Sequence, residues 1–202
     1  MIELSRRTLV VGAVGVVVVL ALGGVGWFWY SAEQNRASSA YAEAIFRVRL
    51  AAKPDDRTAA LRALEATLTR YPSSRGSAQA AYQLGAFRYD AGEYAAARRS
   101  YEIVLARGGS GTLRTLAQAG IGYAWEAELE YAKAIDAYRG ALSRLGPKDF
   151  YYETLLTDLG RSQELAGRKS EAIETYRRLL KEFPQARRAQ EVRGRLVALG
   201  AS

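Results

Sequence analysis

The chain has 202 residues, with 29 lysines and arginines against 21 acidic side chains, and it contains no histidine or cysteine. The absence of both residue types excludes the usual zinc sites and Ser-His or Cys-His catalysis. The net charge of +8 favours acidic partners or an anionic membrane surface. Nucleic acid is the weaker alternative, because the arginines are scattered and form no recognisable reading motif.

An uncharged stretch of 25 residues separates Arg7 from Glu33 and predicts a transmembrane helix over residues 9–30. A helix rises about 1.5 Å per residue, so a stretch of this length can cross a hydrocarbon layer of about 30 Å. The aromatic residues at 27–30 are of the kind that favours the headgroup region. The sequence therefore predicts a membrane anchor at the N-terminus.

Two arginines precede this stretch, so the positive-inside rule predicts a cytoplasmic tail at residues 1–8. Residues 31–202 would then lie outside the cytoplasm, as the periplasmic domain of a single-pass protein of the bacterial inner membrane. The alternative is a cleaved signal peptide with a small-residue site near residues 21–23. A retained signal anchor is preferred, because the apolar stretch continues past that site.

Beyond the anchor, residues 33–53 are predicted to form one helix, because apolar residues recur at helical spacing. Pro54 ends this helix, and one of the two aspartates that follow is a candidate N-cap of the next helix, at about residues 57–71. Together the two helices form a degenerate first repeat at about 41–74, in the frame of the clearer repeats that follow.

One cluster of residues then recurs three times in the same order and at a nearly constant period, with its alanine at Ala97, Ala134 and Ala172. A fixed period of this size predicts a solenoid of helix pairs. We expect the glycine to let two helices approach closely, the alanine to fit under the next helix, and the tyrosine to fill the space between repeats. The three copies are Leu84-Gly85 with Ala97, Tyr101 and Leu105; Ile121-Gly122 with Ala134, Tyr138 and Leu142; and Leu159-Gly160 with Ala172, Tyr176 and Leu180.

The predicted fold class is therefore all-α, with an N-terminal transmembrane helix followed by a solenoid of helix pairs. Gly92 and Gly167 are predicted in left-handed turns inside a pair, whereas Leu129 at the matching place predicts a tighter or more helical turn. The predicted helix pairs are 75–91 with 93–107, 111–128 with 131–145, and 149–166 with 169–183. They lie in repeats at about 78–111, 115–148 and 153–186, followed by a capping helix at 187–199.

This pattern resembles the tetratricopeptide repeat, which reads Trp, Leu-Gly, Tyr, Ala, Phe or Tyr, Ala and Pro. The resemblance covers roughly residues 40–200 and is strongest over 78–184. Proteins of that family bind other proteins and are rarely enzymes. The anchor followed by periplasmic repeats is similar to the YfgM-type ancillary subunit of the bacterial Sec translocon. It is also similar to periplasmic envelope-assembly proteins with comparable repeats.

The resemblance implies that translocon subunits or periplasmic chaperones are partners, and that the protein assists secretion or chaperone hand-off. The alternative is a scaffold for cell-wall or outer-membrane assembly machinery. By the family frame, a concave groove formed by the first helix of each pair would bind these partners. The predicted groove residues are Gln79, Tyr82, Ala86, Tyr89, Leu116, Ala119, Tyr123, Glu126, Thr157, Arg161 and Glu164.

Tyrosine offers a large apolar area with a polar tip, which suits protein recognition. The alternative is that several of the groove tyrosines only pack between helices. Self-association of the chain also stays open.

Carboxylate chemistry is the remaining catalytic hypothesis, with Glu126, Glu128 and Glu130 as its candidates. The first and last of these lie one helical turn apart and could share a cation. A solvated helix end beside Lys133 is the preferred interpretation, because an oxygen-ligand metal site needs more ligands and a shaped loop. We therefore predict no enzymatic activity, no metal and no other cofactor.

Overall fold

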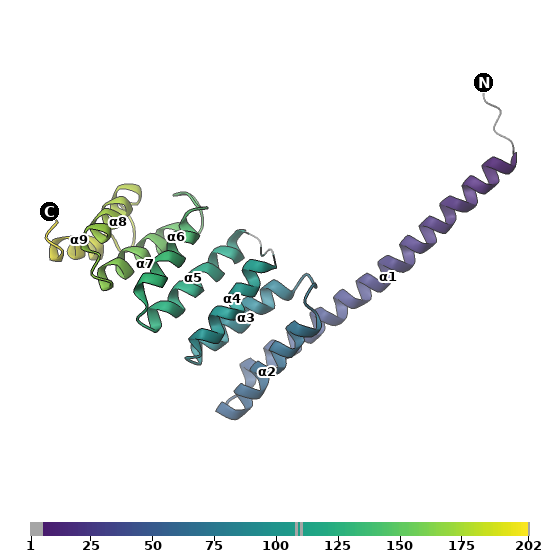
Figure 1. Ribbon diagram of the computed structural model, residues 1–202, viewed down its shortest axis with the longest axis horizontal. Helices are drawn as coiled ribbons and strands as arrows, with labels where there is room; N and C mark the ends of the chain where they lie inside the picture. The colour runs from purple at the N-terminus through teal and green to yellow at the C-terminus, as the bar shows by residue number, and fades with distance from the viewer. Residues whose placement is uncertain (1–5, 108, 110, 202) are drawn as a thin grey trace, which may run out of the picture.

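The computed structural model describes residues 6–107, 109 and 111–201; at positions 6–14, 16 and 18 it describes the backbone alone. Over these residues the chain forms nine α-helices and no strand (Figure 1). The helices are α1 (Arg6–Leu50), α2 (Pro54–Arg70), α3 (Ser77–Asp90), α4 (Tyr94–Ala106), α5 (Gly111–Ala127), α6 (Tyr131–Leu142), α7 (Tyr152–Leu165), α8 (Lys169–Glu182) and α9 (Ala189–Ala198).

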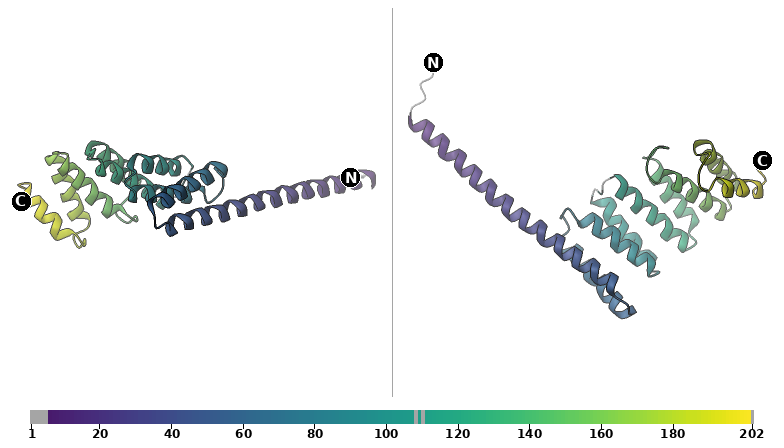
Figure 2. Two further views of the ribbon diagram at one scale, coloured as in Figure 1. Left: turned by 90° about the horizontal axis from the view of Figure 1, so that it is seen from below. Right: turned by 180° about the vertical axis from the view of Figure 1, so that it is seen from behind.

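Helices α2 to α9 stack in chain order into a curved row, each one packed against the next (Figure 2). Helix α1 differs, because its N-terminal half projects away from this row while its C-terminal half packs on α2 and α3. Apolar side chains between neighbouring helices form the core, which begins with Ala37 and Tyr41 of α1 and reaches Leu196 of α9. The all-α solenoid predicted from the sequence is confirmed.

Helix α1 has 45 residues and runs without a break through the predicted anchor and the predicted first repeat helix. Among the described residues, no helix has an apolar stretch long enough to cross a membrane. Several side chains of the predicted span 9–30, and residues 1–5 of the predicted tail, lie outside the described set. The transmembrane assignment therefore stays a prediction.

The start of α2 differs from the sequence prediction of an aspartate N-cap. The N-cap residue is Lys53, in an extended conformation with φ −97° and ψ 146°, and the helix begins directly at Pro54. Proline suits the first helical position, where its missing N–H costs no hydrogen bond and its φ is already helical. Asp55 and Asp56 lie in the first turn instead, where their charge favours the positive end of the helix dipole.

The recurring glycines explain how the two helices of a pair approach each other. A Cβ atom added to Gly85, Gly122 or Gly160 would lie less than 3 Å from the ring of the tyrosine in the same cluster. Such a distance is shorter than van der Waals contact, so glycine alone leaves room for the ring. The alanine of each cluster is completely buried. The close approach of two helices predicted for the glycine is therefore confirmed. The tyrosine was predicted to fill the space between repeats, but each ring packs on the glycine of its own pair; the Tyr101 ring also faces Gly120 of the next pair, as predicted.

The turns inside the three clear pairs share one left-handed residue. Gly92 has φ 77°, Gly167 has φ 72°, and Leu129 takes the same conformation with φ 62°. The predicted tighter turn at Leu129 is therefore wrong, because the packing of α5 on α6 imposes the shared geometry on this residue. A non-glycine residue in this region is strained by roughly 1–2 kcal/mol, and the Leu129 side chain is 70% exposed.

Candidate protein-binding groove

The first helices of the pairs, α3, α5 and α7, carry the predicted groove residues. Tyr82 and Tyr89 lie two turns apart on α3, and so they share one face of that helix. Tyr123 and Glu126 lie one turn apart on α5, and Arg161 lies on the third helix, α7. Contacts of Tyr123 and of Glu126 connect α5 to α7, whereas Tyr82 and Tyr89 pack on α4, inside their own pair.

Tyr123 connects α5 to α7 through its hydroxyl group. The hydroxyl donates a hydrogen bond of 2.7 Å to Oδ2 of Asp158 and lies 2.9 Å from the hydroxyl of Tyr151. The Tyr123 ring also meets the Tyr138 ring edge-on, with centroids 5.8 Å apart. These contacts hold the Tyr123 side chain in one orientation on the face of α5.

Glu126 forms a second connection between the same two helices. Its Oε2 accepts hydrogen bonds from Arg161 at 2.6 Å and from the Tyr138 hydroxyl at 3.0 Å. Its Oε1 accepts one from the Ser162 hydroxyl at 2.5 Å. Arg161 also lies 3.1 Å from Oδ1 of Asp158, so one guanidinium group bridges two carboxylates.

The electrostatics of this network follow from its burial. Burial raises the pKa of Asp158, which is 3% exposed, while the Tyr123 hydrogen bond and the charge of Arg161 oppose that shift. Burial lowers the pKa of Arg161, but hydrogen bonding and charge from Glu126 outweigh it and raise that pKa overall. Burial and the nearby carboxylates raise the pKa of Tyr123 and Tyr138, so both hydroxyls stay protonated donors at neutral pH.

Tyr82 and Tyr89 extend this surface along α3. Their rings pack on second-helix tyrosines, at 5.7 Å from Tyr101 and 5.4 Å from Tyr94 respectively. Burial raises the pKa of Tyr89, and the neighbouring Tyr94 and Glu126 add to that shift. Both tyrosines are half-buried, and within the described residues neither hydroxyl has a hydrogen-bond partner.

Other predicted groove residues lie elsewhere. Gln79 is exposed near the start of α3, apart from the network. Glu164 accepts hydrogen bonds from Tyr176 at 2.9 Å and Arg195 at 3.0 Å, so it joins α7 to α8 and α9. Ala119 and Thr157 are only 1% and 7% exposed; they belong to the packing and offer no surface to a partner. Ala86 and Leu116 are half-buried.

Three residues of the network were not predicted: Tyr151, Asp158 and Ser162. Asp158 occupies the position that Gly120 has in the preceding repeat, where the glycine faces the Tyr101 ring. A carboxylate where another repeat has glycine is the sequence signal that could have identified it. Tyr151 precedes α7 in a left-handed conformation with φ 74°, and no sequence pattern indicated that.

The three glutamates at the end of α5 do not converge. Glu126 faces the groove, Glu128 pairs with Arg98 at 2.6 Å, and Glu130 pairs with Lys133 at 3.3 Å. Within the described residues, no group of three or more acidic side chains could hold a metal ion. Each carboxylate instead has a basic partner within the protein.

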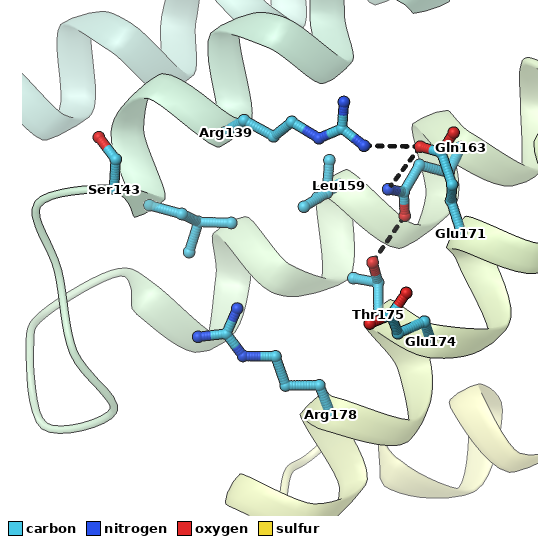
Figure 3. Close-up of a pocket in the computed structure, with 9 residues that line it drawn as sticks. Arg139, Ser143, Leu159, Gln163, Glu171, Glu174, Thr175 and Arg178 are labelled. Carbon is cyan, nitrogen blue, oxygen red and sulfur yellow. Dashed lines mark hydrogen bonds and ion pairs between the residues drawn. The ribbon is translucent and has the colours of Figure 1, made fainter.

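A separate hollow of about 420 Å³ lies between α6 and α8, beside α7, away from the tyrosines of the groove (Figure 3). Its polar side chains bind one another: the Thr175 hydroxyl donates to Gln163 at 2.7 Å, and Arg139 lies 2.6 Å from Glu171. Most of its polar side chains are already paired inside the protein, whereas the Tyr82 and Tyr89 hydroxyls have no partner among the described residues, so the face of α3, α5 and α7 is the stronger candidate site.

Comparison with known proteins supports the architecture. The family of tetratricopeptide repeat-like domains matches residues 7–201, which include α1 as well as the helix pairs. Among solved structures, a crystal structure of putative kinesin light chain nearly identical TPR-like repeats from Podosopora anserina is 14% identical with a TM-score of 0.54. The match covers 83% of this chain and 96% of that chain.

A single-residue variant of the same repeats matches with the same identity and TM-score, over 82% of this chain and 95% of that chain. No curated protein matches the chain significantly. At such low identity the solved structures support the fold alone. The long match to the family decides the classification: the chain belongs to the tetratricopeptide repeat-like domain family, whose repeats form protein–protein interaction modules.

Proposed function

We propose that this protein is a membrane-anchored binding module of the bacterial cell envelope, which assists secretion or chaperone hand-off at the Sec translocon. The observations that carry this proposal are the tyrosines and the hydrogen-bond network on the face of α3, α5 and α7. Tyr82 and Tyr89 offer half-buried rings whose hydroxyls have no partner among the described residues. Aromatic side chains with a polar tip are the residue type on which protein interfaces most often depend.

The network of α5 and α7 prepares the groove for binding. Hydrogen bonds to Asp158 and Glu126 fix the side chains of Tyr123 and Arg161 before a partner arrives. A side chain that is already ordered loses less entropy on binding, which leaves more of the contact energy for affinity. An extended segment of another protein is the ligand that such a curved, tyrosine-lined face would accept.

The proposed anchor is the N-terminal half of α1, over residues 9–30. The described side chains there are apolar and exposed on every side of the helix, including Val17, Leu20 and Trp27. A helix that is apolar all round needs an apolar environment, and a bilayer supplies one. The N-terminus would lie in the cytoplasm and the helix pairs in the periplasm.

Helix α1 would also set the position of the groove. It passes from the proposed anchor into the first helix pair without a loop, so no flexible linker separates the groove from the membrane. Tethering of this kind raises the effective concentration of groove and partner to roughly the millimolar range. Emerging chains would therefore meet the groove close to the translocon exit.

Photo-crosslinking in intact cells tests this function. The probe belongs at Tyr89, because its hydroxyl has no partner in the described structure, whereas a probe at Tyr123 would break the bond to Asp158. The matched control is a probe at Asp136, which is exposed on the second helix α6. We expect translocon subunits, periplasmic chaperones or emerging envelope proteins in the Tyr89 adducts and few of them in the Asp136 adducts.

Two results would change the proposal. Adducts to cell-wall or outer-membrane assembly machinery from Tyr89 would replace the secretion role with a scaffolding role and keep the groove. Equal yields of the same adducts from both positions would show that the groove is not the binding surface.

A further inference from the structure

The loops of the solenoid differ in charge between its two edges. Consecutive helices run antiparallel, so the loops that join one pair to the next share an edge, toward which the N-terminal half of α1 projects (Figure 1). We name it the anchor-side edge; its described residues are 71–76, 107, 109, 143–151 and 183–188. The turns inside the pairs form the far edge, which consists of residues 51–53, 91–93, 128–130 and 166–168.

The anchor-side edge is strongly basic. Its loops carry one acidic residue, Asp149, against six basic ones, a net charge of +5. The far edge carries two basic and three acidic residues, a net charge of −1. The six basic residues of the anchor-side edge are Arg75, Arg107, Arg144, Lys148, Arg187 and Arg188.

The two edges also differ in how their charges are paired. On the far edge all three glutamates have a basic partner within 4 Å, among them Glu93 with Arg88 at 3.9 Å. On the anchor-side edge, Arg188 is the one basic residue with an ion pair among the described residues, at 2.9 Å from Glu191. Arg75, Arg144 and Lys148 are exposed and have none. The positive charge of this edge is therefore available to an outside partner.

Arg75 places the first of these loops next to the proposed anchor. Its guanidinium group lies 5.7 Å from the centre of the Tyr30 ring, and its backbone N–H donates a 2.9 Å hydrogen bond to the Gln34 side chain. Tyr30 belongs to the aromatic group at 27–30, where the proposed transmembrane segment ends. Side chains at this level of an anchored helix lie among lipid headgroups.

We propose that the anchor-side edge binds the anionic headgroups of the membrane that holds α1. This contact would set the direction in which the solenoid tilts toward the membrane surface. This inference rests on the proposed membrane anchor. The surface potential of an anionic leaflet decays over roughly 10 Å. Arg75, which lies beside Tyr30 at the end of the proposed anchor, is therefore attracted more strongly than the basic residues of the later loops. The later loops come closer when the anchor tilts by about 20°, an ordinary tilt for a transmembrane helix.

The charge distribution favours a membrane over nucleic acid as the partner. Positive charge spread along one edge, over four loops beside an apolar helix, matches an extended anionic surface. Each basic side chain close to such a surface strengthens the attraction roughly fivefold. Removing four basic side chains from the anchor-side edge should therefore abolish the tilt of the solenoid toward the membrane, even though the anchor itself stays inserted.

The test uses the full chain in phosphatidylcholine vesicles, prepared with and without phosphatidylglycerol. The chain has no cysteine, so Ser143→Cys on the anchor-side edge provides a single site for a fluorophore. Lipids with a quencher on the headgroup then report how close this edge lies to the surface. We expect several-fold stronger quenching with phosphatidylglycerol than without it, and loss of that difference at high salt.

Two matched variants separate the edge from net charge. The edge variant combines Arg75→Gln, Arg144→Gln, Lys148→Gln and Arg187→Gln. The control combines Arg62→Gln, Arg99→Gln, Arg177→Gln and Arg193→Gln, which removes equal charge from exposed arginines that lie inside helices and have no ion pair among the described residues. The edge variant should lose the quenching difference and the control should keep it.

Several outcomes would overturn this inference. Equal quenching with and without phosphatidylglycerol would do so, and so would an edge variant that behaves like the control. Release of the quenched edge by competing duplex DNA, at concentrations where vesicles are in excess, would point to nucleic acid instead. Alkaline washing provides the remaining distinction: a chain washed off the vesicles contradicts the proposed anchor, whereas a retained chain without quenching contradicts only the role of the edge.

Discussion

The solenoid joins its clear repeats in two different ways. Between the first and second clear pairs, the Tyr101 ring lies between two glycines, and a Cβ on either Gly85 or Gly120 would come within 3 Å of the ring. Between the second and third pairs, Asp158 takes the place that Gly120 has in the earlier repeat. There it binds Tyr123 and Arg161. The first interface is therefore closely packed around the Tyr101 ring, whereas the second holds a buried polar network at the matching position.

This difference shows how one repeat pattern provides both stability and a binding surface. The glycine interface fixes the distance between α3 and α5 by shape alone. The aspartate interface instead orients side chains that also line the groove. A buried polar network contributes little net stability, so its value here lies in presenting Tyr123 and Arg161 in one arrangement.

The largest expected effect comes from Gly120→Ala, which would break the close interface. Its Cβ would overlap the Tyr101 ring, so the helices must separate, at a cost of about 3 kcal/mol in the free energy of unfolding. Urea denaturation followed by circular dichroism measures the change. Gly194→Ala is the control, because no atom lies within 4 Å of its Cβ, and it should stabilise α9 slightly. Equal effects of the two substitutions would contradict the account.

Asp158→Ala would break the polar interface, with a smaller effect. It removes the acceptor of the Tyr123 hydroxyl and one partner of Arg161, at a cost of about 2 kcal/mol. The same denaturation measurement applies, with Asp136→Ala on the exposed surface as a control that should stay within about 0.5 kcal/mol. An Asp158→Ala protein as stable as the control would show that the network is not formed in solution.

Leu129→Gly would sharpen the comparison by relieving strain in the middle repeat. The substitution places glycine at position 129, where the other two pairs have Gly92 and Gly167. The leucine that it removes is 70% exposed, so little packing is lost. We expect a gain of about 1 kcal/mol, after subtracting the entropy that glycine adds to the unfolded chain. Leu165→Gly, at an exposed helical position, should lower the stability instead. A loss of stability in both variants would contradict the assigned strain.

The smallest expected effect concerns pH. Because burial raises the pKa of Asp158 above its ordinary value of 3.8, the native state binds this proton more tightly than the unfolded chain does. The contribution of Asp158 to stability is therefore greatest below pH 3.8 and falls as pH rises through the native pKa. Between pH 3.8 and the native pKa, the stability of Asp158→Asn relative to the wild type should increase with pH. Above the native pKa, the difference in stability should be constant. A relative loss as pH rises toward 3.8, with no change above it, would show instead that the native pKa is lowered.

Sequence reasoning predicted the helix pairs because their determinants are local. The glycine and the tyrosine of one cluster must meet inside each pair, so their spacing identifies the fold. The same frame placed Tyr123, Glu126 and Arg161 on first helices, where the structure brings them together. Their role in binding a partner stays a prediction.

The features that were not predicted depend on contacts between repeats. Asp158 and Ser162 take their roles from contacts with α5, which belongs to the preceding repeat. The left-handed turn at Leu129 is imposed by the packing of α5 on α6, against the preference of leucine itself. The unbroken course of α1 was also missed, because no local signal distinguishes a continuous helix from two helices in sequence.

The central claim is that the groove of α3, α5 and α7 binds the partner. The most direct measurement is the affinity of the crosslinked partner for the full chain and for its Tyr82→Ala/Tyr89→Ala variant, by calorimetry in detergent. Circular dichroism should first show that the variant is folded, and Arg99→Ala/Asp136→Ala provides a control on the second helices. We predict an affinity at least about tenfold weaker for the groove variant and unchanged for the control. Unchanged affinity of a folded groove variant would contradict the claim.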